Sequence, residues 1–295
     1  MKKIKFITCI YNNLYGTIYG GRPNRELHYK WSLLSILKIS DADFVCYTSK
    51  DEYGDLYNFF HIENGVDENK LEIKVFNLSD TPHSDILQKY KDVEKIKKGD
   101  RCLEIQYMKL NWFNFEDGSY DYYYWIDSGL SHCGLIPKKY LSQEGPNNRG
   151  YYESSLFSNK WVNNLVNLSN DKFLLIGKEN KRNFWSQTVN QKHFKVYDNS
   201  IHVIGGLFGG KKELWSEIID LFNVNLNVVS NFDKRLYHEE DILTLMYRNN
   251  SELFESLYFE TWWHEDERIN GIDDMVDFTK KNKSFYRVLE ELNNG

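Results

Sequence analysis

The sequence is poor in cysteine, the residue that stabilises many small secreted folds and zinc-binding folds. Its 295 residues include only four cysteines, and no two of them form a C-x-x-C pair. Disulfide frameworks and zinc sites need closely spaced cysteines, so this pattern indicates reduced thiols in a cytoplasmic protein. The cysteines are Cys9, Cys46, Cys102 and Cys133.

Long apolar runs and an excess of positive charge are missing as well. The N-terminal segment MKKIKFITCIYNN has an apolar run too short for a signal-peptide core, and nothing later approaches a membrane span. The formal net charge is −6, whereas a nucleic-acid-binding protein normally carries a basic patch. We therefore expect no nucleic-acid partner and no membrane span, with peripheral membrane association left open.

Proline is also rare, with four in the chain, and no Gly/Ser-rich linker or internal repeat divides it. A chain of this length can bury a sizeable core. The sequence therefore predicts one continuous, two-lobed domain over residues 1–295. Aromatic residues are frequent instead, at 16%, and those with a polar tip suit a half-wet cleft in which sugar rings stack.

Short apolar runs and helix-like segments follow one another along the chain. The apolar runs predict strands at 3–11, 42–49, 71–78 and 120–126. The helix-like segments predict helices at 25–39 and 102–115. This order predicts an α/β fold with a mostly parallel central sheet and helices on both faces. Farther along, we expect helices at 211–223 and 239–249 and a last strand at 258–266.

One acid ends the most apolar of these strands. Asp127 follows YDYYYWI and precedes Ser128 and Gly129. Ligands of such sheets bind beyond the carboxyl ends of the strands, and a carboxylate there would hold Mn²⁺ or Mg²⁺ against the diphosphate of a nucleotide-sugar. The small residues after it leave room for the diphosphate. The alternative is an aspartate that opens an Asx turn.

Residues near the ends of other elements would support this site. Arg25, or Arg22 beside it, would pair with a phosphate through two guanidinium nitrogens. Lys109, on the helix before the Asp127 strand, would reach the same site, or else it is a solvated helix lysine. The residues expected to line the nucleotide base are Tyr11, Asn12 and Thr48.

The motif GGLFGG (205–210) predicts a loop that lets a ligand approach the backbone closely. In this interpretation Gly206 and Gly209 contact the donor, and the N-terminus of the following helix receives an anion. The alternative is a pair of turns around a packed Leu-Phe dipeptide. The spacing does not match a dinucleotide-binding fingerprint.

Two acidic motifs complete the predicted site. In HEED (238–241), Glu240 or Asp241 would face the sugar and stabilise developing positive charge or bind its hydroxyls; the alternative is complementation of the helix dipole. In WWHED (262–266), His264 would be a metal ligand, or else a surface histidine beside acids.

The order of these motifs resembles a known family. WIDSGLSHCGLIP and VIGGLFGGKKELW, with the N-terminal ITCIYN, GRPNRELHYKW and ADFVCYTS, resemble the bacterial HtrL/YibB (WlaTC-type) glycosyltransferase family over most of the chain. The resemblance implies a GT-A, Rossmann-like fold of the nucleotide-diphospho-sugar transferase type. It also implies a nucleotide-binding half at 1–135 and an acceptor-side half at 136–295. GGLFGG with HEED is similar, too, to the retaining, blood-group-type transferases.

By that similarity Asp127 would be the first acid of a DxD motif, but the third position is Gly129. A second metal ligand would then be His264 or Asp266, or metal dependence is weak.

The function predicted is therefore a metal-assisted glycosyltransferase, with Asp127, Glu240 and Asp241 as catalytic residues. It would move a sugar from a nucleotide-sugar, most simply a UDP-sugar, to a glycan or lipid-linked saccharide. The alternative is a non-catalytic carbohydrate-binding protein on a degenerate transferase fold. A phosphatase or nucleotidyltransferase would need a second carboxylate close to Asp127 in the sequence, which is not there.

Overall fold

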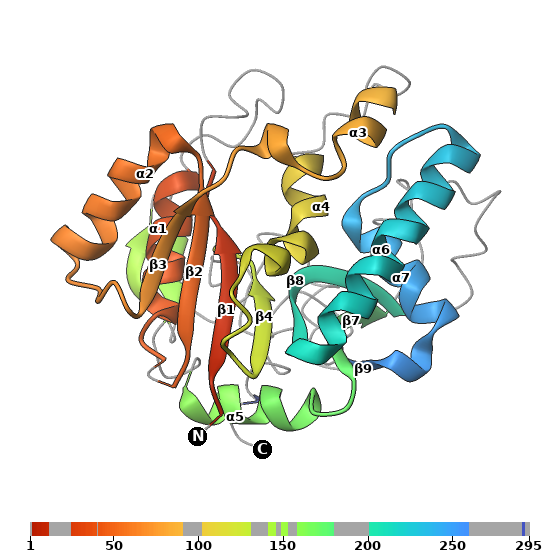
Figure 1. Ribbon diagram of the computed structural model, residues 1–295. Coiled ribbons are helices and arrows are strands. Elements are labelled where there is room, and N and C mark those ends of the chain that lie inside the picture. The colour runs from red at the N-terminus through yellow and green to blue at the C-terminus, as the bar shows by residue number, and fades with distance from the viewer. Residues whose placement is uncertain are drawn as a thin grey trace, which may run out of the picture.

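A seven-stranded sheet forms the centre of the computed structural model, in the order β3-β2-β1-β4-β8-β7-β9 (Figure 1). The structure describes residues 2–11, 25–39, 41–90, 102–130, 141–145, 149–152, 158–179, 201–259 and 291–292.

The first strands of this sheet run parallel to one another. They are β1 (Ile4–Cys9), β2 (Asp43–Thr48), β3 (Leu71–Val75) and β4 (Tyr122–Ile126). β8 (Ile201–Lys211) is antiparallel to both of its neighbours, β4 and β7 (Phe173–Glu179), whereas β9 (Phe254–Phe259) is parallel to β7. A separate two-stranded sheet pairs β5 (Leu141–Gly145) with β6 (Arg149–Tyr152).

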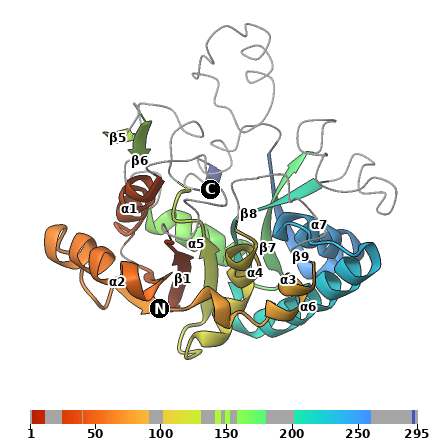
Figure 2. The ribbon, with the colours of Figure 1, turned by 90° about the horizontal axis from the view of Figure 1, so that it is seen from above.

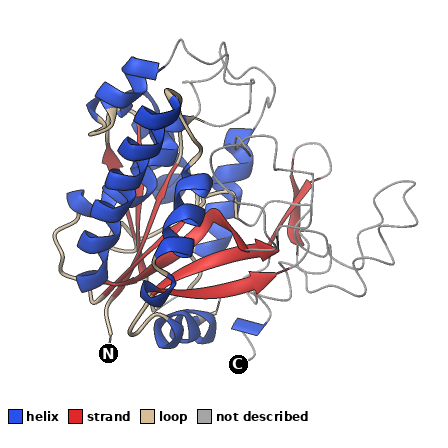
Figure 3. Ribbon diagram, turned by 90° about the vertical axis from the view of Figure 1, so that its right-hand side faces the viewer, coloured by secondary structure: helices blue, strands red, loops and turns tan. Residues whose placement is uncertain are grey.

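Helices cover both faces of the sheet, as the views from above and from the side show (Figure 2, Figure 3). One face packs against α1 (Arg25–Ile36), α2 (Lys50–Tyr57) and α5 (Asn159–Leu168). The other packs against α3 (Ser84–Tyr90), α4 (Leu103–Asn111), α6 (Lys212–Asp233) and α7 (Glu239–Asn249). The predicted fold class, α/β with a mostly parallel sheet and helices on both faces, is confirmed.

The aromatic composition of β4 follows from its position at the centre of the sheet. Its alternate residues enter two different cores: Tyr124 packs with Phe6 on one face, and Trp125 stacks on Trp112 on the other. Every residue of β4 is buried. The buried tyrosines keep a partner for the hydroxyl, as at Tyr124, whose oxygen lies 2.5 Å from Ser169 Oγ.

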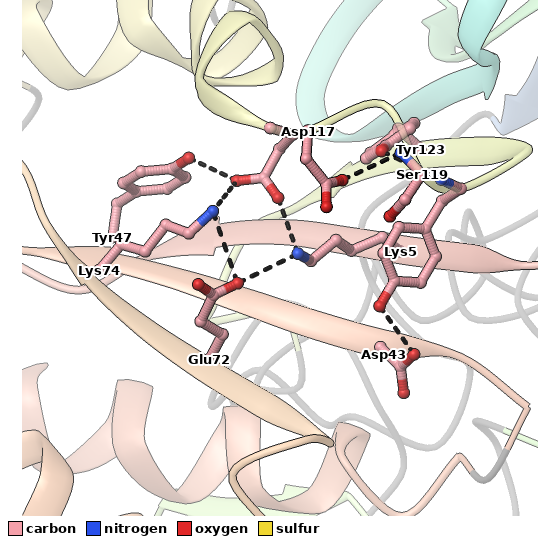
Figure 4. A network of polar contacts seen from close by, with 10 residues as sticks. Lys5, Asp43, Tyr47, Glu72, Lys74, Asp117, Ser119 and Tyr123 are labelled. Carbon is pink, nitrogen blue, oxygen red and sulfur yellow. Dashed lines mark hydrogen bonds and ion pairs between the residues drawn. The ribbon is translucent and has the colours of Figure 1, made fainter.

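A partly buried polar network lies beside β1–β3 (Figure 4). The Lys5 ammonium lies 2.8 Å from Glu116 Oε2 and 3.2 Å from Glu72. The other oxygen of Glu116 accepts from the Tyr47 hydroxyl and from Lys74. Each oxygen of this fully buried carboxylate lies within 3.1 Å of an ammonium, so the network balances its own charges.

The prediction at GGLFGG is wrong. These glycines lie inside β8 and not in a loop. Because β8 runs antiparallel to β4, the helix that follows it starts at the other end of the sheet: Lys212 N donates to Asp121 O, at the amino end of β4. The N-terminus of α6 therefore cannot receive an anion beside Asp127.

Several elements were not predicted. They are α2, α3, α5, β5, β6 and β7. The predicted last strand begins four residues earlier, as β9 at Phe254, and the end of that prediction lies outside the described residues. Among the helices that the structure describes, none is both long enough and apolar enough to cross a bilayer.

Gly209 provides a test of how closely β8 and β4 pack. Its φ is +152°, and an added Cβ would lie 2.3 Å from Tyr123 O. Gly209→Ala should therefore lower the free energy of unfolding by about 2–4 kcal/mol, as measured by denaturant unfolding. Gly210→Ala is the control, because its Cβ would meet neighbours at an ordinary 3.5 Å. Equal stabilities of the two variants would contradict this account.

Candidate active site

A buried lysine joins the three elements that form the candidate site. Lys109 projects from α4 towards the carboxyl end of β4, and its ammonium lies 2.9 Å from Gly205 O. It also lies 3.0 Å from Asp127 Oδ1 and 2.8 Å from Glu239 Oε1. An ammonium has three protons and no acceptor, so these oxygens account for all of its donors. Lys109 is therefore buried against Asp127 and is not a solvated helix lysine, whereas its contact with a donor stays a prediction.

Asp127 directly follows β4 and is held on one side. Its Oδ1 also accepts from the indole N–H of Trp125, at 2.9 Å. Within the described part of the chain no hydrogen bond reaches Oδ2, and the side chain is 40% exposed. One carboxylate oxygen is thus held, and the other is left without a hydrogen bond among the described residues of a partly exposed side chain. The backbone C=O of Asp127 accepts from Leu130 N at 2.9 Å, so a turn follows the strand; this bond is made by the main chain, whereas an Asx turn would need one made by the side chain.

β8 bulges beside this carboxylate. The pairing of β7 with β8 moves from Ile176–Ile204 to Leu175–Phe208, which leaves residues 205–207 without partners in β7. Side chains satisfy the freed backbone: Gly205 N donates to Glu240 Oε1 at 3.2 Å, and Gly205 O accepts from Lys109 and Trp125. Bulges of this kind commonly occur next to active sites.

The acids at the start of α7 have different surroundings. Glu239 is almost fully buried against Lys109. The Glu240 side chain lies against the bulge, with Oε2 3.8 Å from His202 Nε2. Asp241 is buried, and its Oδ2 has no hydrogen-bond partner among the described residues. Only Glu240 among these three keeps partial exposure, at 17% of its side chain.

Burial and neighbouring charges set the protonation states. Burial opposes the charge of Lys109, but Asp127 and Glu239 outweigh it and raise the lysine pKa above its ordinary value. The pKa of Asp241 is raised to about 7, mainly by burial; His202 acts to lower it, whereas the adjacent Glu240 and Glu239 act to raise it. The site therefore has a permanent ammonium and an aspartate that gains a proton near neutral pH.

A divalent cation fits the outward oxygen of Asp127 as a single protein ligand. Mg²⁺ is commonly bound through one or two carboxylates, with phosphates and waters completing the shell. Hydrogen bonds to the second carboxylate oxygen, such as those from Lys109 and Trp125, are typical of the residues behind a metal ligand. Across the described ranges, no group of three His, Cys, Asp or Glu residues is placed to hold a metal.

The other predicted residues lie farther into the fold or outside the description. Tyr11 is buried, stacks on Trp112 and donates to Phe76 O. Thr48 ends β2, where its hydroxyl donates to Glu52. Gly206 lies at the site, since its C=O accepts from Asp127 N at 2.8 Å. Gly209 lies farther along β8, where it packs on β4. Donor contacts of these residues stay predictions.

Some predicted residues cannot be placed. Arg25 is the first residue of α1, but its side chain is not described. The rest lie outside the described residues altogether: Asn12, Arg22, His264 and Asp266.

The sequence interpretation missed three residues of the site: Trp125, Glu239 and Gln106. Trp125 lies two positions before Asp127, and side chains two apart in a strand share a face, so that signal was present. Gln106 Oε1 accepts from Glu239 N at 3.3 Å and lies one helical turn before Lys109. Glu239 lies in the HEED motif, but the motif does not show which of its acids is buried, because the partner of Glu239 is on a distant helix.

Asp241 gives a pH dependence whose sign follows from its raised pKa. Between about pH 4 and pH 7 the folded state retains a proton that the unfolded chain loses, so Asp241 lowers stability as the pH rises through this window. Between pH 4 and pH 8, the free energy of unfolding of the wild type should fall by roughly 2–4 kcal/mol relative to that of Asp241→Asn. Urea unfolding across this range measures it.

The control for this experiment is Asp220→Asn, a change at an exposed position on α6. Its stability should follow that of the wild type at every pH. A difference between wild type and Asp241→Asn that does not vary with pH would contradict the assignment.

Comparisons with known proteins give no family. No protein-family model matches the sequence, and no curated protein matches it. The solved structures that are similar include two at 10% identity. One is 4-diphosphocytidyl-2C-methyl-D-erythritol synthase from Anaerococcus prevotii, with a TM-score of 0.45 and 95% of each chain covered. The other is mouse xyloside xylosyltransferase 1, with a TM-score of 0.49, 86% of this chain and 85% of that chain. Neither likeness is close enough to support an activity.

Proposed function

We propose that this protein is a glycosyltransferase that uses a nucleotide-sugar donor with Mn²⁺ or Mg²⁺. The observation that carries the proposal is the half-exposed Asp127, fixed through one oxygen at the carboxyl end of the central strand. Parallel α/β sheets bind ligands at this place. The motif order that resembles the HtrL/YibB family, with a GT-A fold in one domain over residues 1–295, supports the same activity.

Glycosyl transfer breaks the bond between the anomeric carbon and a diphosphate oxygen. A divalent cation bound at Asp127 Oδ2 would supply positive charge to the departing diphosphate. Lys109 and Trp125 hold the carboxylate that faces this cation. The partly exposed Glu240 would face the sugar, where a carboxylate stabilises developing positive charge at the anomeric carbon.

The finer assignments rest on the sequence. A UDP-sugar is the preferred donor, and a glycan or lipid-linked saccharide is the preferred acceptor. His264 is the candidate second metal ligand. We propose a cytoplasmic enzyme, in which a lipid-linked acceptor would bring the protein to a membrane surface. A non-catalytic carbohydrate-binding protein is the second candidate, because Gly129 stands where a second acid would be.

Thermal-shift measurements with UDP-, GDP- and CDP-sugars, each with and without Mn²⁺, test the proposal. In the presence of Mn²⁺, one nucleotide-sugar at a concentration 100 times its Kd should raise the free energy of unfolding by roughly 2.7 kcal/mol and Tm by about 5 °C. Asp127→Asn should remove the part of the Tm increase that depends on Mn²⁺. Asp121→Asn, at the exposed amino end of the same strand, should keep it.

Two results would decide against this function. Absence of stabilisation by every nucleotide, together with full activity of Asp127→Ala in a glycan-complementation assay, would exclude it. Glycan binding that survives both EDTA and Asp127→Asn would favour the non-catalytic candidate.

A further inference from the structure

We propose that Lys109 and Glu239 are positioning residues that lock the Asp127 carboxylate with only Oδ2 facing outward. The proposal rests on the function above only where it predicts an effect on nucleotide binding. The lock itself concerns the geometry of Asp127 and can be measured separately.

The contacts of Asp127 are one-sided. The Lys109 ammonium and the Trp125 indole N–H both approach Oδ1, at 3.0 Å and 2.9 Å. A partly exposed aspartate would otherwise rotate among several rotamers, and a ligand would have to restrict that motion on binding. Two donors on one oxygen remove the rotation in advance, and they leave a single oxygen for a cation or a hydroxyl.

Glu239 is what holds Lys109 in that place. Its carboxylate is 1% exposed and lies 2.8 Å from the ammonium. Its backbone N–H donates to Gln106 on α4, so α4 and the start of α7 are fixed to each other. Removing a carboxylate partner from a buried ammonium strongly destabilises the folded state, because it leaves buried charge without compensation. Glu239 therefore keeps Lys109 charged and aimed at Asp127.

The bulge of β8 makes room for this pair. A Cβ on residue 205 would lie 2.4 Å from Glu239 Oε1 and 3.1 Å from Lys109 Nζ. The same glycine offers its C=O as the third acceptor of the ammonium. The absence of a side chain at Gly205 is thus a condition for the lock.

The indole resonance of Trp125 reports on the lock without any substrate. In a ¹H–¹⁵N correlation spectrum, the Trp125 peak is assigned by its loss in Trp125→Phe. Its N–H is shared between Asp127 Oδ1 and Gly205 O, so a rotated Asp127 changes its chemical shift. We expect Lys109→Met to move this peak.

Two further variants separate positioning from stability. Lys109→Met leaves Glu239 buried without its partner and should lower Tm. Lys109→Met combined with Glu239→Gln removes that uncompensated charge and should recover much of the Tm, while the Trp125 peak stays displaced. This double variant also keeps the test valid if the single variant fails to fold.

Lys30→Met is the matched control. Lys30 is also a buried helix lysine; it pairs with Asp55 and lies 5.5 Å from an aromatic ring centre, as Lys109 does. It lies on α1, on the opposite face of the sheet. This variant should leave the Trp125 peak in place. An unmoved peak in both Lys109 variants, or an equal displacement in Lys30→Met, overturns the proposal.

Binding of UDP with Mn²⁺, measured by calorimetry, adds the functional readout. The double variant should bind roughly 10- to 100-fold more weakly than the wild type, and Lys30→Met should bind equally well. Unchanged binding by the double variant would overturn the link between the lock and the site. Absence of binding by the wild type would instead count against the proposed function, and the Trp125 result would still decide the positioning role.

Discussion

The ammonium of Lys109 is the interaction on which the candidate site depends. It connects α4, the end of β4, the bulge of β8 and the start of α7 through three short contacts. The oxygens that it holds come from segments far apart in the sequence. A neutral side chain here would leave the buried Glu239 carboxylate without its ion-pair partner, at a cost of about 1–3 kcal/mol or more. The site and the stability of this part of the fold therefore share one group.

Two lysines on this face of the sheet, Lys5 and Lys109, belong to different polar networks. The network of Lys5 is structural, whereas that of Lys109 suits a ligand. At Lys5, the buried Glu116 has both oxygens paired, and the charges are satisfied within the protein. At Lys109, Asp127 keeps one oxygen without a hydrogen bond among the described residues, and its side chain is 40% exposed. Unsatisfied polar atoms in a half-exposed place are more typical of a site than of a core.

The strands and helices could be predicted from the sequence better than the candidate site. Strand residues were recognisable because β1, β2 and β4 are buried on both faces and read as continuous apolar runs. Asp127 was recognisable as the acid that ends such a run. GGLFGG was predicted as a loop because paired glycines normally interrupt strands; here they permit a bulge and a close approach to β4. Glu239 could not be predicted, because its role depends on packing between α4 and α7.

The charge balance of the site argues for a cation beside any diphosphate. Lys109 contributes one positive charge, whereas Asp127, Glu239 and Glu240 place three carboxylates around it. All three protons of the ammonium already have acceptors, so it cannot turn to a phosphate without leaving the buried Glu239 unpaired. A diphosphate arriving at Asp127 Oδ2 would meet repulsion, because like charges at close range disfavour binding. Against the described side chains, a ligand that brings positive charge, or neutral hydroxyls, suits this surface; for the proposed nucleotide-sugar, a divalent cation at Asp127 would supply that charge.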